Sequence, residues 1–216
     1  MHGLASILFQ NPLLFVVMAL ALMFSIAIHE FSHAYVANKL GDATAKNLGR
    51  LTLNPLAHLD PLGTLTLVLV GFGWGKAVPI DYYNLKNPTR DTALISLAGP
   101  ASNFAVATAL TILLKVIGLI ITSNTSTTLA SIVSITSTFI YPIILYNLVL
   151  GIFNLIPVEP LDGFKIVNGI LPSKLAVQWV QLAPYGLYIL ILLMVTGTTS
   201  VIIYPVVNLF VTFLRL

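Results

Sequence analysis

Five apolar stretches follow one another along the chain, separated by shorter segments that carry most of the polar residues. A helix needs about 20 apolar residues to cross the hydrocarbon core of a bilayer, and the last stretch is short for a full crossing. The pattern predicts an all-α polytopic membrane protein with about five transmembrane helices. They are expected at residues 12–37, 91–121, 129–156, 175–196 and 201–214.

The segment between the first two predicted helices, residues 39–90, has a different pattern. It is richer in polar residues, Gly and Pro, and its apolar run at 62–72 is, at roughly 11 residues, too short to span unaided. We interpret this run as re-entrant or interfacial. On either side of it, "GRLTLNP" (49–55) and "GKAVPID" (75–81) alternate apolar and polar residues between Gly and Pro. This alternation predicts short strands, paired into a small β element against the membrane face.

The chain shows no internal repeat and no long linker. We therefore predict a single domain over residues 1–216. Within it, residues 39–90 form a cytoplasmic-side segment, and residues 157–174 form a loop and a short helix. The helices of residues 175–214 then close the chain.

The composition agrees with a membrane protein. Of the 216 residues, 57% are hydrophobic and only 8% are charged, and the mean hydropathy is +0.97. Soluble domains contain roughly 45–50% apolar and 25% charged residues. The ten basic residues outnumber the seven acidic ones, but they form no basic block with interleaved aromatic residues, so we expect no nucleic-acid partner. The chain has no cysteine, which leaves His, Asp and Glu as possible metal ligands.

The distribution of basic residues predicts the orientation of the chain. Lysines and arginines are absent from residues 1–11, from "TSNTSTT" and from "TGTTS", and all except Lys115 lie in the segments of the opposite side. The positive-inside rule places those segments in the cytoplasm and the N-terminus outside. We therefore expect a multi-pass protein of the cell (inner or plasma) membrane.

The stretch "HEFSH", residues 29–33, places ionisable side chains inside the first predicted helix. His29 and His33 are four residues apart, so they project from one helix face at a spacing that can hold one zinc ion, and Glu30 can reach a water molecule beside it. The alternative is a set of buried polar residues with ordinary hydrogen-bond partners. Ionisable side chains at membrane depth cost at least a few kcal/mol, so three within five residues favour a shared cation.

A third metal ligand is expected from "FNLIPVEPLDG", residues 153–163. The prolines end the preceding helix and place Asp162 on irregular backbone at the predicted cytoplasmic side. Asp162 could instead cap a helix that begins near Phe164. Glu159 is a rival carboxylate and His58 another possible ligand, so the residue pattern alone leaves the third ligand open.

Taken together, these motifs resemble the site-2 protease family of intramembrane zinc metalloproteases, in a minimal form without a PDZ domain. "HEFSH" and "NLIPVEPLDG" (154–163) carry the resemblance. Three further stretches support it: "GRLTLNPLAHLDPLGT" (49–64), "GWGKAVPI" (73–80) and "LAGPASN" (97–103). The resemblance implies that His29, His33 and Asp162 bind one zinc ion and that Glu30 is the catalytic base. Glu159 departs from the family pattern, which usually has an apolar residue or proline there.

The resemblance implies hydrolysis of transmembrane protein substrates within the lipid bilayer. Asn154 is a candidate oxyanion donor or substrate partner, although it could equally cap its own helix. Asn103 is a candidate to support a metal ligand, although a polar contact between helices is an equal alternative. The short strands at 50–54 and 76–80 could pair with an unwound substrate. The alternative function is a zinc-binding membrane protein without hydrolytic activity, either a carrier or an inactive family member.

Overall fold

The computed structural model describes residues 4–70, 73–120 and 127–214, and the described part of the chain is built from helices. The first half contains α1 (Leu4–Gln10), α2 (Pro12–Leu40), α3 (Thr44–Asn47), η1 (Pro55–Ala57), α4 (Pro61–Val70), η2 (Tyr82–Asn84) and α5 (Pro88–Ile120). The second half contains α6 (Thr127–Asn154), α7 (Asp162–Ile170), α8 (Ser173–Val180), η3 (Ala183–Tyr185), α9 (Gly186–Val195) and α10 (Thr198–Leu214).

Among the described residues, four helical stretches are long and apolar enough to cross a membrane. They are Pro12–Leu40, Pro88–Leu119, Ile135–Asn154 and Ser173–Val195. The prediction of about five spans is therefore not confirmed. The fifth candidate forms α10, which has 17 residues. At a rise of 1.5 Å per residue it is about 25 Å long, less than the roughly 30 Å of hydrocarbon that it would have to cross.

The ends of α2 follow from its sequence. The Asn11 side chain accepts a hydrogen bond from the backbone N–H of Leu14 at 3.0 Å, and Pro12, whose missing N–H is no loss at this position, begins the helix. At the other end Gly41 has a φ of 112°, a left-handed conformation that glycine adopts without strain. The helix is therefore 29 residues long and continuous through the "HEFSH" motif.

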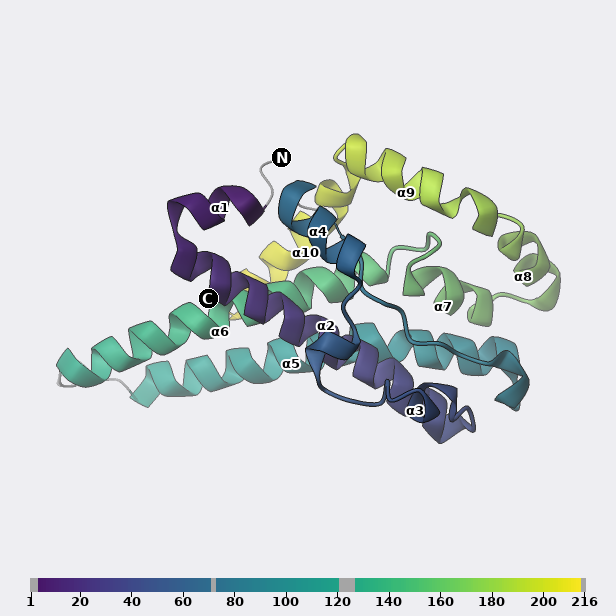
Figure 1. Ribbon diagram of the computed structural model, residues 1–216, viewed down its shortest axis with the longest axis horizontal. Helices are drawn as coiled ribbons and strands as arrows, with labels where there is room; N and C mark the ends of the chain where they lie inside the picture. The colour runs from purple at the N-terminus through teal and green to yellow at the C-terminus, as the bar shows by residue number, and fades with distance from the viewer. Residues whose placement is uncertain (1–3, 71–72, 121–126, 215–216) are drawn as a thin grey trace.

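The long helices α2, α5 and α6 pack together, and α7 packs against α5 (Figure 1). Small residues allow these close contacts. Ala34, Ala37 and Ala107 are fully buried, and a Cβ built at Gly169 of α7 would lie 2.2 Å from the Cβ of Ala93 on α5. Large apolar side chains face outward instead, as at Leu20 and Leu119, where lipid would surround them. The arrangement brings the first helix of the chain close to elements formed much later.

The predicted β element is not found, because the described residues contain no strand. Leu59 and Gly75 form one isolated antiparallel bridge, and the N–H of Lys76 donates to the carbonyl of His58 at 2.8 Å. Two side chains bind the neighbouring backbone groups, which in a strand pair would be hydrogen-bonded to the backbone of the other strand. The Arg50 guanidinium donates to the carbonyl of Lys76, and the N–H of Val78 donates to the carboxylate of Glu30.

The short apolar run predicted at 62–72 forms α4, whose last residue is Val70, while residues 71–72 lie outside the described part of the chain. With 10 residues, α4 is about 15 Å long and too short to cross a bilayer. It lies beside α1 (Figure 1). Its re-entrant or interfacial position stays a prediction.

Asp42 ties the end of α2 to the segment that leads into α5. Its side chain is fully buried and accepts hydrogen bonds from the backbone N–H groups of Thr44 and Asp81 and from the Asn84 side chain, at 3.0, 2.9 and 3.0 Å. Burial would raise the pKa of Asp42, but these hydrogen bonds and one from the Thr44 hydroxyl outweigh burial and lower the pKa below its ordinary value. The ionised form therefore stabilises this corner of the fold.

We predict that Asp42→Asn lowers the free energy of unfolding near neutral pH by about 1–2 kcal/mol, because a neutral amide cannot replace the charged hydrogen bonds to all these donors. A lowered pKa in the folded state stabilises above the unfolded value of about 4, and this stabilisation disappears as the pH falls through the folded-state value. The difference between wild type and variant should therefore shrink on acidification, as measured by thermal unfolding in detergent.

The matched control is Asp60→Asn. The Asp60 carboxylate accepts from the N–H of Gly63 at 2.7 Å at the start of α4, and asparagine is an equally good cap there. This variant should change the melting temperature little. A constant difference between Asp42→Asn and wild type from pH 7 to pH 3 would contradict the assigned role of the Asp42 charge.

Candidate metal centre

Two imidazoles from α2 form one side of the site. His29 and His33 lie one helical turn apart, and their ring centroids are separated by 4.6 Å in an edge-to-face arrangement. Both side chains are buried, with 4% and 7% of the residue surface exposed. The helix therefore holds both rings on one face, away from bulk solvent.

The Nδ1 atoms of both rings face hydrogen-bond acceptors. His29 Nδ1 lies 2.6 Å from the Asn103 side-chain oxygen, and His33 Nδ1 lies 2.7 Å from the backbone carbonyl of Ile95. A carbonyl oxygen cannot donate, so each Nδ1 carries the proton and donates it. In a neutral imidazole the Nε2 atom is then left with a lone pair, which is the form that binds a metal.

Asp162 approaches the same point from a distant part of the chain. It is the first residue of α7, and its Oδ2 atom lies 3.1 Å from His29 Nε2 and 3.2 Å from His33 Nε2. Burial would raise the pKa of Asp162, but when a proton occupies the Nε2 atoms in place of a metal, the hydrogen bonds and charge of His29 and His33 hold the pKa of Asp162 well below its ordinary range. The carboxylate is therefore ionised, as a metal ligand must be.

The three side chains together fit a zinc ion. Their ligand atoms all lie within 4.8 Å of one another, and all three residues are buried. Two imidazole nitrogens and one carboxylate oxygen form a ligand set of catalytic zinc sites, which keep the fourth position for water or substrate. The supporting hydrogen bonds on both Nδ1 atoms fix the ring orientations in the way that such sites require.

Gly99 lets α5 approach the two histidines. A Cβ built at this position would lie 2.5 Å from His33 Nε2 and 2.6 Å from His29 Nε2, closer than any real contact. The backbone of α5 therefore forms the wall of the site directly beside the two ligand atoms. Gly99 belongs to the "LAGPASN" stretch that supports the family resemblance, but its contact with the imidazoles was not predicted from the sequence.

Glu30 follows His29 on α2 and is half-buried. Its Oε2 atom accepts a hydrogen bond from the backbone N–H of Val78 at 3.1 Å. An extended segment, far from α2 in sequence, therefore holds the carboxylate in place. Because this donor is a main-chain group, no residue type in the sequence could have predicted the contact.

Other candidate residues have partners elsewhere. His58 is fully buried and its Nε2 lies 2.8 Å from the carbonyl of Thr52. The Asn154 side-chain amide donates to the carbonyl of Leu150, one turn earlier in α6, at 3.0 Å. Asn103, in contrast, contacts His29 directly.

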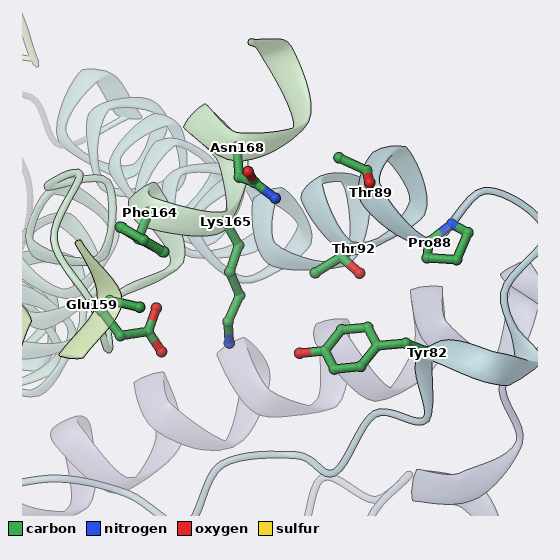
Figure 2. Close-up of a pocket in the computed structure, with 9 residues that line it drawn as sticks. Tyr82, Pro88, Thr89, Thr92, Glu159, Phe164, Lys165 and Asn168 are labelled. Atoms are coloured by element: carbon green, nitrogen blue, oxygen red, sulfur yellow. The ribbon is translucent and has the colours of Figure 1, made fainter. Parts of the chain in front are cut away.

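Glu159 lines a separate pocket of ≈ 340 Å³ (Figure 2). Tyr82, Thr92 and Lys165 also line it, and Figure 2 shows the Lys165 ammonium group between the Glu159 carboxylate and the Tyr82 hydroxyl. Within the described residues, Glu159 does not belong to the group of side chains whose ligand atoms lie together. Asp162 is the carboxylate that the fold brings to the two histidines.

Comparison with known proteins agrees with this geometry. Residues 17–195 match the model of a family described as Peptidase family M50. A Bacillus subtilis (strain 168) protein named "Putative zinc metalloprotease YwhC" is 39% identical over 194 residues, which cover 88% of this chain and 85% of that protein. No solved structure matches the chain significantly.

Two further relatives match part of their own length. "Zinc metalloprotease MJ0392" of Methanocaldococcus jannaschii is 28% identical over 165 residues, 76% of this chain and 37% of that protein. "Putative zinc metalloprotease Rip2" of Mycolicibacterium smegmatis is 35% identical over 99 residues, 43% of this chain and 38% of that protein. The chain belongs to peptidase family M50, the site-2 protease family of zinc metalloproteases. With four helices long enough to span, it is a multi-pass membrane protein.

We predict that Gly99→Ala weakens zinc binding about tenfold or more, because the added methyl group occupies the space of the imidazole nitrogens. Gly118→Ala is the matched control. It lies in the same helix, and a Cβ there meets no atom within 4 Å, so zinc affinity should not change. Competition with a zinc chelator measures both. Equal affinities of the two variants would show that α5 does not form the wall of the site.

We also predict that Asp162→Ala and Glu159→Ala have different zinc contents. The first should lose its zinc after dialysis against a weak chelator, because two imidazoles alone remain. The second should keep it, because Glu159 lies in the separate pocket. Elemental analysis of the purified variants measures the difference. Loss of zinc from Glu159→Ala alone would reverse the assignment of the third ligand.

Proposed function

We propose that the protein is an intramembrane zinc-dependent endopeptidase that cleaves transmembrane helices of membrane protein substrates. The observation that supports this most directly is the meeting of His29, His33 and Asp162. The two histidines lie inside α2, a helix long enough to cross a membrane, so the site lies among membrane helices. Membership of a zinc metalloprotease family gives the class of reaction.

In this proposal each residue has one role. His29, His33 and Asp162 hold a single zinc ion, which supplies Lewis acidity to a water molecule and to the scissile carbonyl. Glu30 accepts the proton of that water and returns it to the leaving amine. The N–H of Val78 keeps the Glu30 carboxylate oriented between these two transfers. Ile95 and Asn103 hold the imidazole rings through their Nδ1 atoms.

The substrate must lose its helical structure near the cleaved bond. Inside an intact helix each carbonyl is hydrogen-bonded and shielded by side chains, so it cannot reach the ligand cluster. Asn154 is our candidate to bind the exposed backbone or the oxyanion. Its amide donates to Leu150 within α6, so taking that role would require it to exchange this partner for the substrate.

We further propose that the N-terminus lies outside the cell and that the site faces the cytoplasmic side of the cell membrane. The lysines and arginines support this orientation, because nine of the ten lie in segments on one side of the predicted helices. Lys39, in the last turn of α2, belongs to this group. His29 and His33 lie nearer to this end of α2, which carries Lys39, than to the end at Pro12.

We predict that Glu30→Gln retains zinc but cleaves a model transmembrane helix in detergent or vesicles at least about 100-fold more slowly, because an amide cannot accept the proton. Glutamine keeps an acceptor oxygen for the Val78 N–H, so the fold should be unchanged. Glu159→Gln is the matched control, a carboxylate of the separate pocket, and should cleave at the wild-type rate. Zinc content and cleavage rate are measured on the same preparations.

The same experiment distinguishes the proposed protease from the alternative, a zinc-binding membrane protein without hydrolytic activity. Undiminished cleavage by Glu30→Gln would exclude this residue as the base. Wild-type protein that binds zinc but cleaves no membrane helix offered would instead favour a zinc-binding protein without hydrolytic activity.

A further inference from the structure

A closed network of polar side chains lies between α2, α5 and α6. Its members are Ser25 on α2, Asn103 on α5 and Asn147 on α6, and each of them is 0% exposed. Three polar side chains in the interior of membrane helices are expensive unless their hydrogen-bonding groups are satisfied. Asn103 touches the candidate ligand His29, whereas Ser25 and Asn147 do not touch any candidate ligand through the hydrogen bonds of the described residues.

Each amide in the network has a defined orientation. The Asn103 Nδ2 group donates to the carbonyl of Ser25 at 3.2 Å and to Asn147 Oδ1 at 2.7 Å. The Asn147 Nδ2 group donates to Ser25 Oγ and to the carbonyl of Ile143, both at 2.8 Å. Ser25 Oγ in turn donates to the carbonyl of Ala21 at 2.8 Å. All hydrogens of both amides are therefore used.

Main-chain carbonyls fix the direction of this network. A carbonyl accepts and never donates, so Ile143 requires the nitrogen of Asn147 on its side, which turns the Asn147 oxygen toward Asn103. That oxygen and the Ser25 carbonyl both require the nitrogen of Asn103 on their side. The Asn103 oxygen then faces His29 Nδ1, which must carry a proton to bond to it.

We propose that Asn147, supported by Ser25, is a positioning residue that keeps the Asn103 oxygen on His29 Nδ1 and so fixes the His29 ring with its Nε2 directed toward Asp162. This inference rests on the proposed role of His29 as a zinc ligand. If Asn103 rotated, its nitrogen would face His29 Nδ1, and because both groups donate, the hydrogen bond that fixes the ring would be lost. Asn147 opposes this rotation through the shorter of the two Asn103 Nδ2 contacts.

The first test is zinc affinity, measured by chelator competition on the full-length protein. Asn147→Leu, of similar volume, should bind zinc about tenfold more weakly, the lower end of the range for residues that support metal ligands. Ser25→Ala should have a smaller effect of the same sign, because Asn147 keeps its bond to Ile143. Asn147→Asp retains an acceptor for Asn103 Nδ2, and it should bind zinc more tightly than Asn147→Leu.

Thr111→Val is the matched control. Thr111 is also 0% exposed and lies on α5, but its hydroxyl donates to the carbonyl of Ala107 in its own helix, outside the network. Its zinc affinity should equal that of the wild type. If Asn147→Leu does not fold, Ser25→Ala carries the test. Wild-type affinity in every network variant that folds would overturn the proposal.

The second test follows the hydrogen bond between His29 Nδ1 and Asn103 directly in zinc-free protein. In ¹H–¹⁵N correlation spectra of the His29 ring, the Nδ1–H signal should be shifted downfield and exchange slowly in the wild type, and it should lose this shift and protection in Asn147→Leu. In an Asn103→Ala background, Asn147→Leu should cause no further loss of zinc affinity, because its route to His29 is gone. A wild-type Nδ1–H signal in Asn147→Leu, or a full additional loss of zinc affinity in the double variant, would contradict the inference.

These readouts need no substrate, so they do not depend on cleavage. If wild-type protein bound no zinc, the proposed function would fail, while the Nδ1–H signal of His29 in the zinc-free protein would still test the role of Asn147.

Discussion

The convergence of three ligand atoms from α2 and α7 is the constraint on which the rest of the site depends. Two imidazoles and a carboxylate at 3.1–3.2 Å are tolerable in a buried position because hydrogen bonds fix them from outside and because a shared cation can neutralise the carboxylate. The fold meets this constraint by packing α5 against both α2 and α7. Gly99 permits the contact of α5 with α2, and Gly169 permits the contact of α7 with α5. Both close approaches are possible because glycine has no side chain.

Polar contacts are unusually important for the association of helices in this interior. Lipid tails are as apolar as leucine, so apolar contacts between helices gain little from leaving the bilayer. Packing of small residues and hydrogen bonds between helices therefore contribute more of the specificity. The network of Ser25, Asn103 and Asn147 joins three helices in this way, and the apolar cluster around Ile144 and Leu148 fills the space beside it.

The sequence predicted the all-helical class and four of the expected spans, because a long apolar run has few alternatives, but the fifth span was not confirmed. It did not predict the path of residues 49–81, where the alternation of apolar and polar residues suggested strands. The alternation does not follow burial in the structure, since Arg50 is buried and Leu53 is exposed. Arg50 and Glu30 bind the backbone groups that a strand pair would need. The spacing of His29 and His33 pointed to a metal, but the residue pattern left the third ligand open until the family resemblance and the fold favoured Asp162.

Other parts of the site could not be predicted from residue types at all. The acceptor for His33 is the carbonyl of Ile95 and the donor to Glu30 is the N–H of Val78, so both are main-chain groups. Asn147 did leave a signal, since an asparagine within an apolar helix needs partners, but its position alone could not show that those partners lead to His29.

The position of the histidines within α2 has a consequence for how water reaches them. Leu40, the last residue of the helix, is seven positions after His33, which corresponds to about 10 Å. Each hydrolytic event consumes one water molecule, and because both imidazoles are buried that molecule has to pass between protein side chains to reach them. A hydrated passage from the aqueous phase to the imidazoles is therefore as necessary for turnover as the ligands themselves.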